Sequence, residues 1–548
     1  MISGIRSEIS EPTIERGGHM KKDMMKVVAP VMALSMAATL FAGCGGKEEA
    51  PTDAAAVEQG GKNEAGTAAP AASSAGKDTL IIATANETES VTTNLHNAVA
   101  GDYLNKMTHN SLFFPDDSLE PQPDLVDSYE ILSDTEWLFH LKKGVKFHNG
   151  MEMTAKDVKA SLELCKESPE VAQYGKSSGV IEVVDDYTVK MTTDGPQSGL
   201  LADLCHHGNA ILPAELIENG HNFNKEPIGT GPYVLKAWNK GESLEFEAFP
   251  DYFKGEAPIK HIIWKIIPEG SSRTMALEAG EADLVVEVEN NDITRLDGSD
   301  KITVYQSPGT SHNFMMINNE KAPFNNINFR KALASAIDKE AIVKVALNGT
   351  GSSVDCMVPN CFPGTTDEMA PTYDVEKAKE YLKASGLNPA DCGFALICSD
   401  DLKLRAGQVI QSCLKDNLGI EITLESMDLA TYLDVTATGD YQAAIGNYTS
   451  SDLLAYVSGV YHSKSINASN KTRTNEANID ALIDKLQSTV DKEENEKIAT
   501  ELSIAVNENC PQVALWMENN RRVYDKDLQG FNLNAGGNTY YNRFSWGN

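Results

Sequence analysis

The sequence has few basic residues relative to acidic ones. Lysine and arginine together number 47 against 79 aspartates and glutamates, which gives a formal net charge of −32 in a chain of 548 residues. Such a chain repels the phosphates of DNA and RNA instead of attracting them. We therefore expect no nucleic acid partner, and we interpret the acidic surplus as a well-solvated surface.

The sequence also lacks the short motifs of common enzymes and metal sites. It has no G-x-S-x-G, no H-E-x-x-H and no G-K-[ST] phosphate loop. Cys205-His206-His207 is the only close cluster of cysteine and histidine, but adjacent residues rarely bind one metal together, so we favour an ordinary loop there. The sequence predicts a protein without enzymatic activity, bound metal or cofactor.

The N-terminal apolar run is too short for a membrane-spanning helix, which needs about 20 residues. From Met20, a head with three lysines precedes the apolar residues 27–42, and Pro30 interrupts the run. This layout is typical of a secretory signal. Residues 1–19 are acidic and polar, so we expect translation to start at Met20 and predict a signal sequence within residues 1–43.

The signal ends at a cysteine that is followed by a polar segment. Leu40-Phe41-Ala42-Gly43-Cys44 resembles the lipobox of bacterial lipoproteins, in which the cysteine is lipidated and becomes the mature N-terminus. The following residues, up to about 77, are mostly small or polar and cannot bury enough surface to fold. We predict that residues 44–78 form a lipidated cysteine and a disordered tether at the outer face of the cell membrane.

Eight cysteines follow Cys44, and an even number permits disulfide bonds in an exported protein. Cys356 and Cys361 enclose a short loop in which a bridge is geometrically possible, and Cys392 with Cys398 are a second candidate pair. A zinc site is less favoured, because no second cysteine or histidine pair at ligand spacing accompanies either couple. The pairing stays open.

Hydrophobic periodicity predicts that strands and helices alternate along the chain. The expected elements are strands at 79–83, 137–141, 244–248 and 262–266, and helices at 329–337, 375–386 and 479–490. Thr154 is predicted to cap a further helix. Gly229 and Gly231 are interpreted as a turn that needs free φ at two positions. This interleaving indicates an α/β protein.

Several blocks of the sequence resemble one family. EWLFHLKKGVKFHNGMEMTAKDV at 136–158 is similar to the signature block of the family 5 extracellular solute-binding proteins, the peptide and nickel class. Further blocks that agree in order and spacing lie at 228–233, 249–284, 323–343, 511–516 and 523–524. The resemblance covers essentially all of residues 79–548.

The resemblance implies a two-lobed fold of the periplasmic-binding-protein type, class II and cluster C, with an extra inserted domain. In this family a hinge joins the lobes, which close over the ligand. The corresponding segments here are 79–107, 213–314 and 512–548 for lobe I, 108–212 for the inserted domain and 315–511 for lobe II.

The resemblance also implies a substrate-binding protein that captures peptides, as oligopeptides or dipeptides, and delivers them to the permeases and ATPases of an ABC importer. Ligand binding then selects the closed state, and no reaction takes place. We expect a monomer, attached to the membrane through Cys44. A nickel chelate or an oligosaccharide is the alternative ligand, and a sensor is the alternative role.

The resemblance places ligand contacts in the loop that follows residues 439–445. In peptide-binding relatives an aspartate of this loop pairs with the α-amine of the ligand, and Asp452 matches it by spacing, with a helix N-cap as its alternative role. The family's tryptophan and Asp-Pro are absent, because Asn447 and Leu453 stand in their places, so dipeptide specificity is not fixed. The other expected ligand-binding residues are Asn447, Tyr448, Thr449 and Ser451, together with His96 and His312 of lobe I.

Overall fold

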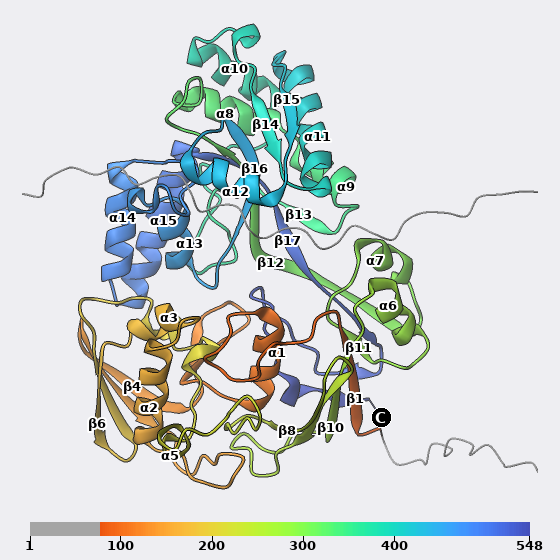
Figure 1. Ribbon diagram of the computed structural model, residues 1–548. Helices are drawn as coiled ribbons and strands as arrows, with labels where there is room; N and C mark the ends of the chain where they lie inside the picture. Colours follow the sequence, from red (N-terminus) through yellow and green to blue (C-terminus); the bar gives the residue numbers. More distant parts are fainter. Residues whose placement is uncertain (1–76, 548) are drawn as a thin grey trace, which may run out of the picture. The chain divides into compact units, whose positions relative to one another are not determined.

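The computed structural model describes residues 77–547 of the chain. The predicted signal sequence, the start at Met20, Cys44 and nearly all of the predicted tether lie outside the described residues. Within 77–547, no helix combines the length and the apolar character needed to cross a membrane. These residues form a mixed α/β structure, which confirms the predicted fold class (Figure 1).

The largest sheet has 11 strands in the order β15-β14-β16-β12-β17-β11-β1-β10-β9-β8, with β13 also paired to β17. Its strands are β1 (Thr79–Thr84), β8 (Tyr233–Asn239), β9 (Ser243–Ala248), β10 (His261–Ile266), β11 (Leu284–Val285), β12 (Ile302–Ile317), β13 (Gly351–Ser353), β14 (Ala395–Cys398), β15 (Thr423–Ser426), β16 (Ala443–Thr449) and β17 (Gln512–Asp525). The predicted strands at 79–83, 244–248 and 262–266 are all confirmed, as β1, β9 and β10.

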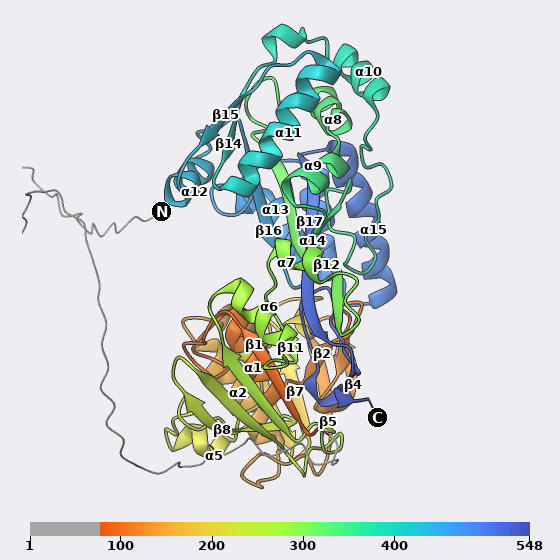
Figure 2. The ribbon, with the colours of Figure 1, turned by 90° about the vertical axis from the view of Figure 1, so that its right-hand side faces the viewer.

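The two longest strands, β12 with 16 residues and β17 with 14, hold this sheet together. They pair antiparallel from Ile302 with Asp525 to Met316 with Gln512. Strand β17 also pairs with β11, and β12 with β16. The two strands therefore join the group of strands around β1 to the group around β14, and Figures 1 and 2 show them running between these groups.

A separate sheet of 4 strands has the order β4-β5-β7-β6. Its strands are β4 (Val126–Ser133), β5 (Glu136–Leu141), β6 (Val180–Asp185) and β7 (Thr188–Thr192), and the short hairpins β2 (Phe113–Pro115) with β3 (Pro121–Pro123) and β18 (Leu528–Gln529) with β19 (Ser545–Trp546) lie outside both sheets. The alternation predicted for Trp137, Phe139 and Leu141 is confirmed, because all three are buried in β5.

The helices begin and end at residues suited to these places. They are α1 (Val99–Thr108), α2 (Ala155–Lys166), α3 (Ala172–Lys176), α4 (Leu200–Asp203), α5 (Ala214–Glu218), α6 (Gly270–Glu278), α7 (Asn290–Leu296), α8 (Ile327–Ala336), α9 (Lys339–Ala346), α10 (Val375–Ser385), α11 (Asp401–Leu418), α12 (Leu429–Thr438), α13 (Leu453–Val460), α14 (Ala477–Ser488) and α15 (Lys492–Asn509). The predicted cap at Thr154 is confirmed, since its backbone N–H donates to Asp157 at 2.7 Å at the start of α2. Gly386 ends α10 in the left-handed conformation, as expected. The helix predicted over 479–490 ends at Ser488, so Val490 lies beyond it.

The buried apolar residues form separate cores. One cluster is built almost entirely from residues between Phe314 and Trp516, a second from residues between Leu112 and Ile228, and a third combines Leu80 and its neighbours in the sheet with Tyr541 and Phe544. Such separate clusters are expected of a chain this long. The exact limits predicted for the lobes and the inserted domain stay predictions.

The eight cysteines within 77–547 are all free thiols, and five of them are buried. Burial raises the pKa of Cys356 to about 11 and that of Cys361 to about 12. Both groups are therefore protonated near neutral pH, and neither of the two candidate pairs forms a bridge in this structure.

The glycines of the Gly229-Thr230-Gly231 turn are required for a different reason from the predicted one. Neither has a positive φ, so the expectation of free φ at two positions was wrong. Instead, the turn packs against the end of α1: a Cβ atom on Gly229 would lie 2.3 Å from the carbonyl oxygen of Thr108, and one on Gly231 would lie 2.5 Å from the amide nitrogen of His109. Close approach of two backbones, and not φ, excludes side chains here.

We predict that Gly231→Ala destabilises the protein by about 1–3 kcal/mol, because the methyl group overlaps backbone atoms that cannot rotate away. Urea unfolding of the mature protein measures this. Gly195→Ala is the matched control, since no atom lies within 4 Å of its Cβ position. Equal unfolding midpoints for the two variants would contradict the close-packing interpretation.

Candidate functional site

A cleft of about 570 Å³ lies among segments that are distant in the sequence. The residues that line it belong to 97–106, 115–121, 174, 202–207, 309–311, 448–455, 518–520 and 535–538. Its volume is within the range of about 300–1,000 Å³ that is usual for small-molecule sites. The cleft is thus the candidate functional site of the described residues.

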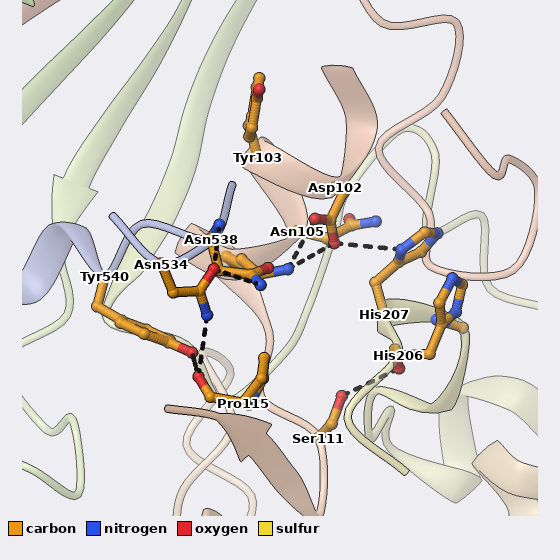
Figure 3. Close-up of polar contacts among 12 residues, drawn as sticks. Asp102, Tyr103, Asn105, Ser111, Pro115, His206, His207, Asn534, Asn538 and Tyr540 are labelled. Atoms are coloured by element: carbon orange, nitrogen blue, oxygen red, sulfur yellow. Dashed lines mark hydrogen bonds and ion pairs between the residues drawn. The ribbon is translucent and has the colours of Figure 1, made fainter. Parts of the chain in front are cut away.

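Helix α1 forms one wall of the cleft with Asp102, Tyr103 and Lys106. Asp102 and Lys106 lie one helical turn apart and form an ion pair at 2.7 Å. The second partner of Asp102 is the His207 ring, at 3.2 Å from Nδ1 (Figure 3). Burial raises the pKa of Asp102, but Lys106 and His207 lower it by more, so that its pKa lies below the ordinary value. The charges of this wall are therefore satisfied within the protein.

Four aromatic rings stack beside α1. Tyr174 and His206 lie 3.6 Å apart between ring centroids, His206 and His207 lie 4.2 Å apart, and His207 and His96 lie 4.7 Å apart. Burial, with help from His207, lowers the pKa of His96 to about 4 and that of His206 to about 2. Both rings are therefore neutral at pH 7, and His206 presents an uncharged aromatic ring to the cleft.

The Cys205-His206-His207 cluster does not form a metal site in the described part of the chain. Residues 77–547 contain no group of three or more histidine, cysteine or acidic side chains that could hold a metal ion. Burial raises the pKa of Cys205, whose thiol donates to the carbonyl oxygen of Leu201 at 3.3 Å.

The opposite wall is a loop that is fixed by asparagine side chains. Asn534 donates to the carbonyl oxygen of Asp116 at 3.0 Å. It also accepts from the backbone N–H of Asn538 at 3.0 Å (Figure 3). Asn520 of β17 donates to the carbonyl oxygen of Ala535 at 2.8 Å. These bonds hold residues 535–538 against the cleft.

The floor of the cleft is formed where β12 and β17 lose their regular pairing. Pro308 pairs with Asn519 and His312 with Met517, so that the segment 309–311 of β12 lies opposite Glu518 alone. This is a β-bulge, and its residues line the cleft together with 518–520 of β17. The two strands that join the groups of the sheet therefore also line the cleft.

The segment that follows residues 439–445 meets the cleft at some positions only, and it is not wholly the predicted loop, because β16 continues through Thr449. Tyr448, Thr449 and Ser451 line the cleft, whereas Asn447 is exposed elsewhere. Asp452 does not line the cleft; it caps α13, with Oδ1 accepting from the backbone N–H of Ala455 at 2.8 Å. Burial raises the pKa of Asp452. The structure thus shows the N-cap role that the sequence left as the alternative.

The two predicted histidines lie behind the lining. His96 is 6% exposed and packs on His207 without lining the cleft. His312 is fully buried, with Nδ1 at 2.7 Å from the hydroxyl oxygen of Tyr456. Burial lowers the pKa of His312 to about 3. Its side chain points into the core, while Ser311 before it faces the cleft.

Most of the lining residues were not found from the sequence, and those of α1 and β17 are examples. Asp102 and Lys106 show only the spacing of an ordinary surface helix pair. Glu518 had a clearer signal, because it is the first charged residue after the buried apolar run 513–517 and precedes Asn519.

Comparison with known proteins identifies the family. The sequence profile of the bacterial extracellular solute-binding proteins, family 5 (middle part), matches residues 120–468. The chain belongs to this family. Its members are extracytoplasmic substrate-binding proteins that bind peptides or related ligands for ABC importers. This assignment confirms the predicted class of protein.

Individual relatives agree with this assignment. Heme-binding protein A of Haemophilus influenzae is 26% identical over 454 residues, covering 76% of this chain and 82% of that protein. The dipeptide-binding protein of Escherichia coli is 27% identical over 364 residues, covering 60% of this chain and 67% of that protein. The structure of HbpA2 from Haemophilus parasuis has a TM-score of 0.79 at 23% identity and covers 85% of this chain and 99% of its own, so the two-lobed fold is shared.

We predict that His312→Gln reduces the pH dependence of stability. The folded-state pKa of His312 is lowered to about 3, so its contribution to stability is fully present above the unfolded pKa of about 6.5 and is lost as the pH falls below it. Between pH 6 and pH 5 the wild type should lose about 1 kcal/mol more than the variant. Urea unfolding at both pH values measures this, and parallel losses would show that His312 is not buried and neutral.

Proposed function

We propose that this protein captures small peptides in the cleft and delivers them to the permeases of an ABC importer. The observation that carries the proposal is the composition of the cleft: tyrosines, serines, threonines and asparagines of α1, β12, β16, β17 and other lining segments surround one space. A peptide has a donor and an acceptor on each residue, so it is recognised by such uncharged polar groups. The kinship with the dipeptide-binding protein supports the same ligand class.

Three of the predicted ligand-binding residues are supported by their position. Tyr448, Thr449 and Ser451 line the cleft, where the tyrosine ring offers stacking area and the hydroxyl groups offer hydrogen bonds. Asn447, His96 and His312 lie outside the lining, so a role for them in binding is indirect.

A metal chelate or heme is the second candidate ligand. His206 and His207 line the cleft, and heme-binding protein A is among the relatives. Two observations disfavour this ligand. Both rings pack on neighbouring rings, and His207 is paired with the carboxylate of Asp102. These contacts would have to break before an imidazole nitrogen could reach a metal, and we therefore favour peptides.

The proposal includes a lipid anchor at Cys44 and a monomeric state. The anchor rests on the sequence, in which a signal ends in a lipobox-like segment and a polar tether follows. The monomeric state stays an expectation. With about 30 residues, a flexible tether has a root-mean-square reach of about 30 Å, which is enough to lift the folded part off the membrane and let it meet the permeases.

We predict that short peptides raise the melting temperature of the protein. A ligand at 100 times its Kd stabilises by about 2.7 kcal/mol, because it binds the folded state only. The test is a thermal-shift screen of peptides of two to five residues, oligosaccharides, hemin and the nickel(II)–histidine chelate. Stabilisation by hemin or the chelate and by no peptide would exclude peptide capture.

We predict that Cys44→Ser releases the protein from the membrane. The thioether to the lipid cannot form without the thiol, so metabolic labelling with a fatty-acid analogue should be lost and the protein should appear in the soluble extracellular fraction. Cys413→Ser is the control, since this cysteine lies on α11 in the folded part. Unchanged labelling of the Cys44 variant would exclude this anchor.

A further inference from the structure

We infer that Glu518 binds a primary ammonium group of the ligand at the floor of the cleft. The inference rests on the proposed peptide capture and assigns the residue that receives the amino end. It differs from the sequence prediction, which gave this role to Asp452.

Glu518 is the carboxylate in the cleft lining that the protein leaves without a cation. The lining contains three charged lysine, aspartate or glutamate side chains: Asp102, Lys106 and Glu518. Asp102 and Lys106 neutralise each other at 2.7 Å. Among the described residues, no lysine, arginine or histidine nitrogen lies within 4.0 Å of the Glu518 carboxylate. A net negative charge in the cleft favours a cationic ligand group.

The nearest arginine of the same strand is occupied elsewhere. Arg521 directs its guanidinium to the side chain of Asn290 and does not line the cleft. Burial lowers the pKa of Arg521, and Glu518 and Glu289 partly offset this effect. The charge of Glu518 therefore raises the pKa of Arg521 from a distance, but the two side chains do not form an ion pair.

The bulge fixes the position of the carboxylate. Asn313, which is 1% exposed, donates from Nδ2 to Oε1 of Glu518 at 3.3 Å. Across the bulge, a Cβ on Gly309 would lie 2.8 Å from the carbonyl oxygen of Glu518, so the strands approach as closely as a glycine permits. Glu518 itself is exposed. One of its oxygens is oriented by the protein, and the rest of the carboxylate is open to a ligand.

Asp452 is less suited to this role. Its two carboxylate oxygens already accept from the backbone N–H of Ala455 at 2.8 Å and from the hydroxyl group of Ser451 at 2.9 Å. Binding a ligand amine would compete with the N-cap of α13. Glu518 has no such competing bonds beyond the one to Asn313.

The experiment compares peptides that differ only in the charge of the amino end. An equimolar mixture of lysine- and arginine-free peptides of two to five residues is presented with free amino ends and, separately, after acetylation. Native mass spectrometry and calorimetry measure retention and Kd. We expect the wild type to bind the free peptides at least about tenfold more tightly than the acetylated ones, and Glu518→Gln to abolish this difference, as for a charge-assisted hydrogen bond.

Controls separate the possible outcomes. Glu182→Gln removes an equal charge from exposed β6 and should leave the difference unchanged, while Glu518→Asp should restore part of it. If Glu518→Gln does not fold, Glu518→Ser replaces it as the variant that lacks the carboxylate. A preference for free amines that survives in Glu518→Gln, or that disappears in Asp452→Asn instead, overturns the assignment and leaves peptide capture intact. If the wild type retains neither mixture, peptide capture fails and the assignment with it.

Discussion

The pairing between β12 and β17 is the interaction on which the rest of the structure depends. The two strands bond to each other over most of their length, and through β11 and β16 they connect both groups of the large sheet. Their regular ladder is interrupted at the bulge of residues 309–311, and the cleft lies there. The bulge bends β12 locally, so the strands that join the two groups are irregular at the point where they line the cleft.

The charges of the cleft follow a simple division. The walls carry an ion pair that is satisfied internally, Asp102 with Lys106, together with the stacked rings of Tyr174 and His206. The floor carries an open carboxylate on a strand that takes part in joining the two groups. Under the proposed function, a wall of this kind tolerates many ligand side chains, because its ion pair is satisfied within the protein. Specificity would then depend on the floor and on the hydroxyl groups near β16.

Periodicity and turn chemistry made much of the fold predictable, whereas the site was only partly so. Alternation identified β5, β9 and β10, and Gly386 marked the end of α10, because these signals act locally. The reason for Gly231 could not be found this way, since its constraint comes from Thr108 and His109, more than a hundred residues earlier. His312 and Ser311 are neighbours on one strand with opposite surroundings, and the sequence alone does not tell which face meets the cleft. The position of Glu518 in the cleft depends on the pairing of β17 with β12, which is about 200 residues earlier in the sequence. No local sequence pattern indicates this pairing.

The position of β17 in the sequence has a consequence for biogenesis. Among the 11 strands of the large sheet it is synthesised last, yet it lies between β11 and β12, and the sheet order contains no other link between the two groups. A nascent chain that emerges N-terminus first therefore cannot complete this sheet until residues 512–525 have been made. A fold that waits for its last central strand therefore keeps the two groups of the sheet unjoined until synthesis is almost complete.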